Sequence, residues 1–232
     1  MPAERPLGTV YVTGGSSGLG AAVVAAVAKA GGRPAVIDIA PPEDTSIPYA
    51  VADLSDSAAA ERAVADLTER VGPPSAVVTA AGTDACGPLG EIPVDAWERV
   101  VRVNLLGTAA VIRACLPALE EAGGTVVTVA STLGLRAAGD ATAYCASKFG
   151  VVGFTRALAM ELAGRVGVTL LVPGGMRTHF FDGRTEQYKP GPDAQLNDPA
   201  DVAEVVTFAL RQPPGCEVRE LVVASSTEPS WP

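Results

Sequence analysis

The sequence is short of the residues that build metal centres and disulfide frameworks. It holds one histidine, His179, and four cysteines that are widely spread and form no C-x-x-C pair. A single histidine excludes a multi-histidine metal site, and the cysteine spacing fits neither a metal site nor a disulfide framework. We therefore expect no bound metal and reduced, mostly packed thiols.

Long apolar runs and an excess of positive charge are absent as well. No run of about 18 residues is free of glycine, proline and charge, so no membrane span is expected. The first residues, Met-Pro-Ala-Glu-Arg-Pro, hold no apolar signal core. Lys and Arg number 17 against 26 Asp and Glu, which disfavours nucleic acids and anionic membranes as partners. These features together predict a cytoplasmic protein.

What is present is a regular alternation of short β-branched runs with longer runs of helical period. Strands are predicted at 9–12, 35–37, 49–51, 76–79, 125–129, 168–172 and 221–223, and helices at 19–30, 57–71, 95–119, from 144 onward and from 198 onward. Near-continuous apolar strands that alternate with helices predict an α/β fold, a doubly wound parallel β-sheet flanked by helices on both faces. We expect residues 1–232 to form a single domain.

Local signals mark several boundaries of these elements. Asp95 and Glu98 resemble a capping box at the start of the third helix. Asp198 and Pro199 combine an N-cap with proline at the first helical position. The segment 174–197 is the longest one without periodicity, and such loops are often lids or binding loops. We expect it to be a substrate loop.

The first predicted strand leads directly into the glycine-rich run T-G-G-S-S-G-L-G at residues 13–20, and a helix follows. Glycines at such a junction let the backbone approach a pyrophosphate, and the free N–H groups at the helix start attract it. The spacing is G-x-x-x-G-x-G rather than G-x-G-x-x-G, and the alternative is an ordinary strand–helix turn. The residues expected to contact a dinucleotide here are Gly14, Ser16, Ser17, Gly18, Leu19 and Gly20.

Asp38 ends the second predicted strand and bears on the choice of dinucleotide. A carboxylate at this place accepts hydrogen bonds from a ribose 2′-OH and repels a 2′-phosphate. No Lys or Arg lies within the glycine-rich run or just after Asp38, and Arg33 is the only base nearby. The sequence therefore favours NAD over NADP, and the alternative for Asp38 is a solvated strand end.

The same glycine-rich run also matches G-x-S-x-G, the nucleophile turn of many hydrolases. Ser16 would then be the nucleophile, and Asp140 and His179 follow it in the order of such a triad. However, a nucleophile turn needs a sheet and an oxyanion loop that precede it, and few residues precede Ser16. A hydrolase stays the minor alternative.

Tyr144 and Lys148 lie four residues apart at the head of a long apolar helical run, with Ser131 upstream. On a helix the two side chains share one face, one turn apart. A nearby ammonium favours phenolate and lowers the pKa of a phenol from about 10. The pair therefore predicts an acid–base catalyst for a carbonyl or alcohol oxygen. The alternative is a helix surface with a solvated lysine and a half-buried tyrosine.

With these residues in view, the chain resembles the classical short-chain dehydrogenase/reductase family over nearly its whole length. Residues 13–20 match its T-G-x-x-x-G-x-G, Asn104 matches its N-x-x-G, and Pro173-Gly174 with Thr178 matches its P-G-x-x-x-T. Ala80-Ala81-Gly82 corresponds to its N-A-G element but lacks the asparagine. A side chain that braces the sheet is therefore lost or replaced.

The resemblance implies a Rossmann-type fold and hydride transfer between a nicotinamide cofactor and a secondary alcohol or ketone. It implies that Tyr144 exchanges the proton of the substrate oxygen and that Lys148 lowers the pKa of Tyr144 and binds the ribose. It further implies that Ser131 binds the substrate oxygen and that Asn104 holds a water linked to Lys148. The further cofactor contacts that it implies, besides Tyr144 and Lys148, are Asp53, Leu54, Ala80, Ala81, Gly82, Pro173, Gly174, Met176 and Thr178.

Two other functions remain open at this point. One is a protein that binds or senses a dinucleotide without turnover, and the other is an NADPH-dependent ketoacyl-type reductase. The family resemblance also implies a homotetramer or homodimer. Val152 and Ala157 on the Tyr144 helix would belong to a dimer face or to the core, and Trp231 would be frayed or packed on a neighbouring subunit.

Four residues of the expected substrate loop each have two possible roles. His179 would touch the substrate or be solvated. Phe180, Phe181 and Tyr188 would form a lid or only anchor the loop to the body.

Overall fold

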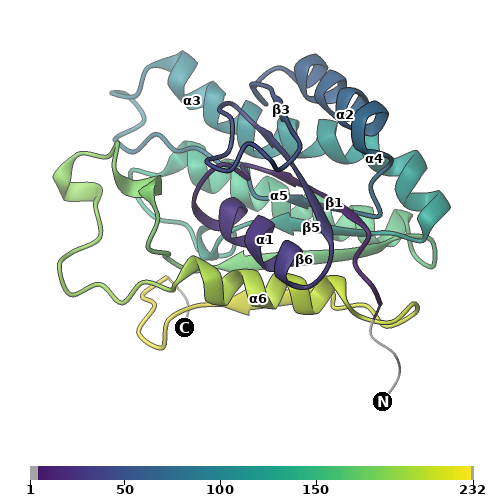
Figure 1. The fold of residues 1–232 in the computed structure, drawn as a ribbon. Helices are drawn as coiled ribbons and strands as arrows, with labels where there is room; N and C mark the ends of the chain where they lie inside the picture. Colours follow the sequence, from purple (N-terminus) through teal and green to yellow (C-terminus); the bar gives the residue numbers. More distant parts are fainter. Residues whose placement is uncertain (1–4, 231–232) are drawn as a thin grey trace.

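The computed structural model describes residues 5–230, which form one seven-stranded parallel sheet in the order β3-β2-β1-β4-β5-β6-β7 (Figure 1). The strands are β1 (Thr9–Thr13), β2 (Arg33–Asp38), β3 (Tyr49–Val51), β4 (Ala76–Thr79), β5 (Thr125–Val129), β6 (Gly167–Pro173) and β7 (Glu220–Val223). All seven lie where the sequence predicts them, within two residues at each end. Runs of valine, isoleucine and threonine form these strands because both faces of the sheet are covered.

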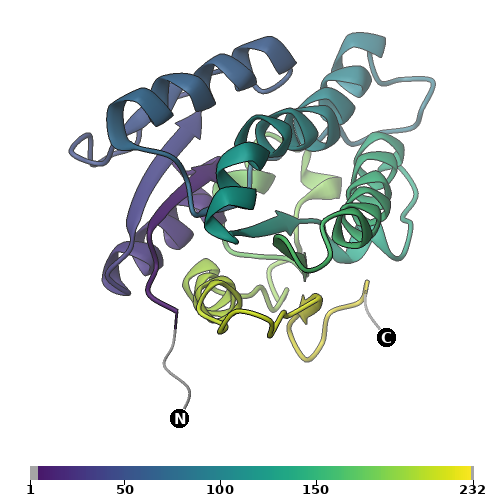
Figure 2. The same cartoon turned by 90° about the vertical axis from the view of Figure 1, so that its right-hand side faces the viewer.

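Helices pack on both faces of the sheet, as Figure 2 shows. The helical elements are α1 (Gly18–Lys29), α2 (Ser57–Val71), α3 (Val94–Val101), η1 (Arg102–Gly107), α4 (Thr108–Ala122), η2 (Thr132–Gly134), α5 (Thr142–Glu161), η3 (His179–Phe181), η4 (Glu186–Tyr188) and α6 (Pro199–Leu210). Helices α1 and α6 cover one face of the sheet, where they share a core cluster with Val10 and Val12 of β1. Tyr11 points to the other face, where α2, α4 and α5 pack. The predicted doubly wound α/β fold is confirmed.

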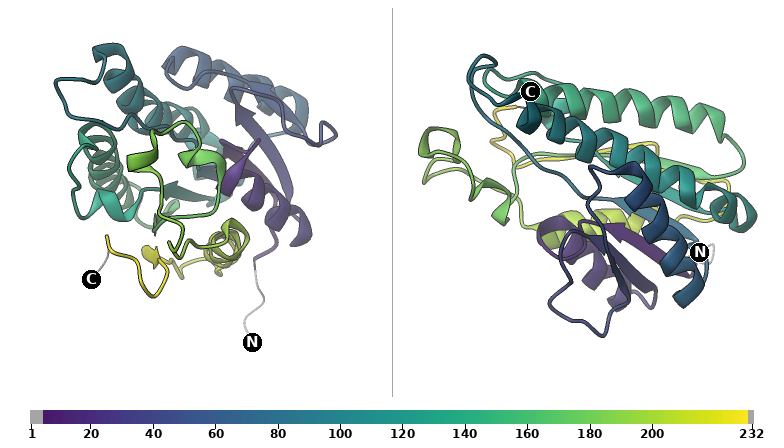
Figure 3. Two further views of the ribbon diagram at one scale, coloured as in Figure 1. Left: turned by 90° about the vertical axis from the view of Figure 1, so that its left-hand side faces the viewer. Right: turned by 90° about the horizontal axis from the view of Figure 1, so that it is seen from above.

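The strand order reverses between β1 and β4, and this point organises the functional end of the molecule. From β1 the chain winds outward through β2 and β3, and from β4 it winds the other way through β5, β6 and β7. Ligands of open α/β sheets bind outside the carboxyl ends of the strands at such a switch point. The segment 174–197 lies across this end of the sheet (Figure 3, left, light green).

The helix predicted at 95–119 is a continuous helical stretch, Val94–Ala122, with a π-helical segment, η1, in its middle. The predicted capping box is wrong. The N-cap is Pro93, so Asp95 lies inside the first turn, and Glu98 pairs with Arg102 instead of reaching back. Asp198 does cap α6, since its side chain accepts a hydrogen bond from the Ala200 N–H.

This stretch is also the one helix of the described residues that has the length and composition to cross a membrane, with a mean hydropathy of 1.4 in its most apolar window. Half of that window is buried inside the protein, where α4 packs on α2 and on the sheet. A core helix of a globular domain shows the same pattern, so its apolar composition is explained by packing.

Two further expectations can be compared with the structure. On α5, Val152 packs in the core beside Leu170 and Val172, whereas Ala157 is exposed near Met160. Val152 is thus not part of an exposed face. Trp231 lies outside the described residues.

Candidate active site

A cavity of about 960 Å³ lies at the carboxyl ends of the strands and joins the glycine-rich turn to Tyr144. Most of the residues predicted to bind a cofactor line it. These are Gly14, Ser17, Gly18, Leu19, Gly20, Asp38, Asp53, Leu54, Ala80, Ala81, Gly82, Tyr144, Lys148, Pro173, Gly174, Met176 and Thr178, and Ser131 lines it as well. Residues far apart in the chain therefore meet at one site.

The N-terminus of α1 fits a pyrophosphate. Its N-cap, Ser17, makes no side-chain capping bond, and the first turn carries no acidic residue. Helices α2 and α6 differ, since Asp56 and Asp198 cap them with a carboxylate. The free N–H groups of α1 thus face the cavity without a competing anion. Gly14 and Gly18 have φ angles of 68° and 52°, which glycine adopts without strain.

Ser16, unlike its neighbours, does not line the cavity. Its backbone N–H donates to Asp38 Oδ2 at 2.9 Å, and its hydroxyl donates to the Ala40 carbonyl at 2.7 Å. Ser16 therefore positions Asp38, and its role as a cofactor contact stays a prediction. Asp38 keeps its place at the cavity wall, at the end of β2. Arg33 begins β2 and donates to Thr9 Oγ1, so it lies at the opposite end of the strand.

Asp53 and Arg99 form an ion pair at the same end of the cavity, with 2.9 Å between Arg99 Nη1 and Asp53 Oδ2. The hydrogen bonds from Arg99 and from the Ser55 backbone lower the pKa of the Asp53 carboxyl to about 2. The carboxylate is therefore ionised at neutral pH. The sequence identified Asp53 but gave no signal for Arg99, which reaches it from α3.

The missing asparagine of the 80–82 element is replaced by a brace from β1. Thr13 Oγ1 accepts a hydrogen bond from the Ala81 N–H at 3.1 Å. The neighbouring Thr79 hydroxyl is buried and has no hydrogen-bond partner. The loop after β4 is thus held by a threonine that the sequence analysis assigned only to the glycine-rich run.

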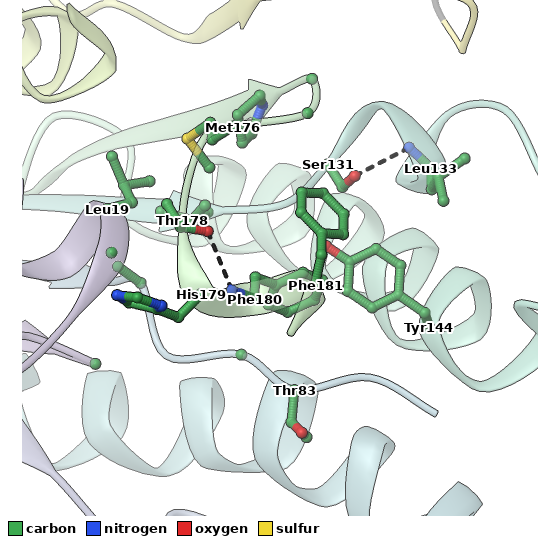
Figure 4. Close-up of a pocket in the computed structure, with 18 of the residues that line it drawn as sticks. Leu19, Thr83, Ser131, Leu133, Tyr144, Met176, Thr178, His179, Phe180 and Phe181 are labelled. Carbon is green, nitrogen blue, oxygen red and sulfur yellow. Dashed lines mark hydrogen bonds between the residues drawn. The ribbon is translucent and has the colours of Figure 1, made fainter. Parts of the chain in front are cut away.

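Tyr144 and Ser131 lie together at the other end of the cavity (Figure 4), and Lys148 lines the cavity as well. Lys148 Nζ lies 5.7 Å from the centre of the Tyr144 ring and donates to the Val129 carbonyl at 2.8 Å. Tyr144 lies in the first turn of α5, and the Ser147 hydroxyl donates a hydrogen bond to the backbone carbonyl of Tyr144. Ser131 follows the end of β5 by two residues and is the N-cap of η2, and its hydroxyl accepts a hydrogen bond from the Leu133 N–H. The predicted constellation is brought together.

The electrostatics of this pair differ from the expectation. Burial raises the pKa of the Tyr144 phenol to about 12, and a hydrogen bond with Ser131 opposes this rise only in part. Burial also lowers the pKa of Lys148 to about 8. The expected lowering of the phenol pKa by Lys148 is therefore not found, because the effect of burial on the phenol is larger than the effects that favour the phenolate. At neutral pH the phenol is protonated and can donate its proton.

Asn104 lies in the π-helical segment, is 1% exposed and does not line the cavity. Its Nδ2 donates to the Thr83 carbonyl at 2.9 Å and to Ser147 Oγ at 3.0 Å, and its Oδ1 accepts from the Thr83 N–H at 2.8 Å. The side chain thus joins the loop after β4 to α5. π-Helical segments are frequent at functional sites. The predicted water relay stays a prediction, whereas the bracing contact is observed.

The two ends of the segment 174–197, which is called the lid below, are hydrogen-bonded to each other. The Asn197 N–H donates to the Gly175 carbonyl, and the Arg177 N–H donates to the Asn197 carbonyl. Phe180 and Phe181 line the cavity, and the Phe180 ring lies 5.7 Å from that of Tyr144.

The two remaining residues of the lid that the sequence singled out lie further out. Tyr188 anchors the lid, because its hydroxyl donates to Asp140 Oδ2 at 3.0 Å. His179 lines the rim of the cavity, but its side chain is 89% exposed and pairs with Asp182.

Two groups at this end of the cavity carried no signal in the sequence. Arg184 of the lid pairs with Asp84, and the two side chains are only 17% and 6% exposed. Glu228, beyond β7, folds back over the end of β6 and accepts from the Gly175 N–H at 2.9 Å. Both come from loops whose positions depend on long-range packing, so no local pattern could have found them.

The hydrolase alternative does not assemble. Ser16 is bonded to Ala40, His179 to Asp182, and Asp140 to Tyr188, so the three residues have separate partners. In the described part of the chain no cluster of metal-binding side chains is present and the cysteines are free, with Cys115 and Cys145 buried, Cys86 half-buried and Cys216 exposed.

Comparisons with known proteins agree with this geometry. The family model for short chain dehydrogenase matches residues 8–189. The chain is 38% identical to a 2-dehydro-3-deoxy-L-rhamnonate dehydrogenase (NAD(+)) of Sphingomonas sp. over 74% of this chain and 73% of the relative. It is 31% identical to an acetoacetyl-CoA reductase of Synechocystis sp., over 87% of each chain.

Among solved structures, an alcohol dehydrogenase from the archaeon Thermococcus sibiricus, complexed with 5-hydroxy-NADP, has the same fold. The TM-score is 0.83 at 24% identity, and the match covers 94% of this chain and 96% of the other. The extent of the family match, the fold and the assembled residues lead to one conclusion. The chain belongs to the short-chain dehydrogenase family and is an oxidoreductase that uses a nicotinamide cofactor.

Proposed function

We propose that the protein is an NAD-dependent oxidoreductase that interconverts a ketone and a secondary alcohol, with Tyr144 as the acid–base group. The observation that carries this proposal is the single cavity that joins the uncapped N-terminus of α1 and Asp38 to Tyr144 and Ser131. A dinucleotide that lies along this cavity would have its pyrophosphate at α1 and its nicotinamide near Tyr144.

When bound, the cofactor supplies or accepts the hydride. The chain's own residues would bind the substrate and move the proton. Ser131 Oγ, just beyond the C-terminal end of β5, would donate a hydrogen bond to the substrate oxygen. The Tyr144 hydroxyl, protonated at neutral pH, would donate its proton to that oxygen as it gains negative charge. Lys148 would add positive charge beside the phenol and would bind the ribose, and Asn104 would keep the loop at Thr83 in place.

Three observations support NAD rather than NADP. Asp38 lines the cavity with its carboxylate held by the Ser16 N–H, and a 2′-phosphate at this place would meet a like charge. Arg33, the base that weakens the prediction from sequence, lies at the other end of β2. The name of the Sphingomonas relative, which states NAD(+), supports the same choice.

The proposal extends to the state of the protein in the cell. We propose that residues 1–232 act as one domain and that the protein is cytoplasmic and acts on a small molecule, not on nucleic acid or a membrane. We further propose a homodimer or homotetramer. The exposed apolar side chains of Phe149 and Met160 on α5 support an interface between copies of this chain.

The test uses a panel of ketones with NADH or NADPH and follows the absorbance of the reduced nicotinamide. We expect turnover with NADH. The variant Tyr144→Phe should lower kcat by about a hundredfold to ten-thousandfold, because it removes the proton donor, and should still bind NADH. Tyr49→Phe is the matched control, since Tyr49 lies on the edge strand β3, and it should keep full activity. A Tyr144→Phe protein with normal kcat would contradict the assigned role.

The same panel separates the alternatives. A protein that only senses a dinucleotide would bind NADH and turn over none of the ketones. An NADPH-dependent ketoacyl-type reductase would prefer NADPH and an acetoacetyl thioester. The Synechocystis relative is named for acetoacetyl-CoA, which is the observation that keeps this second candidate in the panel.

A further inference from the structure

The charges around the substrate end of the cavity are arranged in a way that bears on the class of substrate. The cation that the lid brings to this end is Arg184. Its Nη2 donates to Asp84 Oδ2 and its Nη1 donates to the Tyr188 carbonyl at 3.1 Å. The rings of Phe180 and Phe181 lie 5.3 and 4.7 Å from the guanidinium carbon, and its Nε is buried without a hydrogen-bond partner. The charge of Arg184 is thus compensated by Asp84, and its unpaired Nε is shielded from the cavity by burial.

A carboxylate faces the same space without a basic partner. Glu228 lines the cavity and accepts hydrogen bonds from the Gly175 N–H and from Ser230, whose hydroxyl lies 2.6 Å from Oε1. Partial burial works against ionisation, but the hydrogen bonds from Ser230 and Gly175 bring the pKa of Glu228 below its usual value. Among residues 5–230, no Lys or Arg forms an ion pair with it. Arg136, which follows η2, donates to the Pro229 carbonyl and does not line the cavity.

The Glu228 carboxylate is held close to the catalytic groups. Ser230, which donates to it, also hydrogen-bonds Thr132 with 2.7 Å between the two hydroxyl oxygens, and Thr132 follows Ser131 directly. At its other end the carboxylate lies against the turn after β6. A Cβ atom placed on Gly174 would be 2.4 Å from Oε2. Glu228 therefore occupies a fixed position between the turn after β6 and the turn that carries Ser131.

Apolar side chains form much of the cavity wall, beside polar ones such as Gln195 and Thr227. The apolar ones include Leu133, Met176, Phe180, Phe181, Pro190 and Leu196. A second carboxylate, Asp193, lies at its exposed rim. An anionic substrate would thus meet two like charges, a compensated arginine and apolar walls, whereas an uncharged apolar body would lose little on entry.

We propose that the site selects uncharged carbonyl compounds with an apolar body, and that Glu228 and the Asp84–Arg184 pair exclude substrates that carry a carboxylate or phosphate. This inference rests on the proposed oxidoreductase function of the same site. It makes Glu228 a residue that determines specificity, at a position where the sequence shows no motif.

The test compares a cyclic ketone that carries a carboxylate with its methyl ester, so that the two compounds differ in charge and little else. We expect kcat/KM for the ester to exceed that for the carboxylate by about tenfold or more. Glu228→Gln should narrow this ratio severalfold by improving the carboxylate alone. Asp84→Asn should improve it too, because Arg184 then loses its neutralising partner. Glu220→Gln, which removes a carboxylate paired with Arg156 on β7, is the control and should leave the ratio unchanged.

Binding of the two compounds is measured in parallel by calorimetry on the wild-type protein saturated with NAD⁺, which cannot reduce a ketone. Binding of the ester in preference to the carboxylate, without turnover when NADH is supplied, would support the selectivity and refute the oxidoreductase function. A carboxylate that binds or reacts as well as its ester would overturn the inference, and so would failure of both to bind. If Glu228→Gln left the ratio of kcat/KM for the ester to that for the carboxylate unchanged, Glu228 would not be a determinant of the selectivity. If Asp84→Asn does not fold, Glu228→Gln decides alone.

Discussion

The substitution Asn104→Ala distinguishes between two roles of the Asn104 side chain. One role is to hold the loop after β4 in place, and the other is to take part in a proton relay. Asn104 makes three side-chain hydrogen bonds, two to the backbone of Thr83 and one to Ser147. Each partner left unpaired costs about 1–1.5 kcal/mol, and the Thr83 groups regain some bonding to water. The free energy of unfolding should therefore fall by about 2–4 kcal/mol. Since Gly82 and Thr83 line the cavity, NADH should also bind more weakly.

The measurement is equilibrium unfolding in urea, with NADH affinity and kcat determined on the same preparations. Gln212→Ala is the matched control, because it removes an exposed amide that donates to the Phe208 carbonyl and accepts a long contact of 3.9 Å from the Cys216 thiol. The control should change the free energy of unfolding by less than about 0.5 kcal/mol. If Asn104→Ala kept the stability and the NADH affinity of the wild type while kcat fell more than about a hundredfold, the bracing argument would be refuted and a direct role in proton transfer favoured.

Two further predictions concern the cofactor and the buried lysine. Asp38→Ser should lower the ratio of kcat/KM for NAD to that for NADP by about tenfold or more, because the charge that repels a 2′-phosphate is removed. The control Asp56→Ser, at the N-cap of α2, should leave that ratio unchanged. Equal ratios in the wild type and both variants would contradict the argument. The pKa of Lys148 is 10.5 as a free group and about 8 when folded, which corresponds to about 3 kcal/mol of destabilisation that is fully present below pH 8. From pH 8 to 10.5 the unfolded chain binds more protons than the folded one. The free energy of unfolding of the wild type should therefore rise with pH relative to that of Lys148→Met. Parallel curves of unfolding free energy against pH for the two proteins would disprove this.

The sequence by itself determined the parts of this protein that depend on neighbours in the chain. The period of the apolar residues placed the strands and helices, because it reflects which faces are buried. The glycines at 14, 18 and 20 predicted the turn before α1, since only the local backbone is at issue. The spacing of Tyr144 and Lys148 predicted that they share a helix face, and this also is a local property. Where a competing local residue intervened, as Pro93 does before Asp95, the prediction of the cap was wrong.

The tertiary structure alone decided the burial, the pKa shifts and the long-range contacts of the assembled residues. Lys148 was expected to lower the pKa of Tyr144, but the depth at which α5 is buried raises the phenol pKa and lowers that of the ammonium. Asp84 and Arg184 are 100 residues apart in the chain, and Glu228 reaches Gly175 from beyond the last strand. Such contacts depend on the order of the strands and on the course of the loops between them. Desolvation and long-range charge pairing have no period in the sequence, so only the folded chain fixes them.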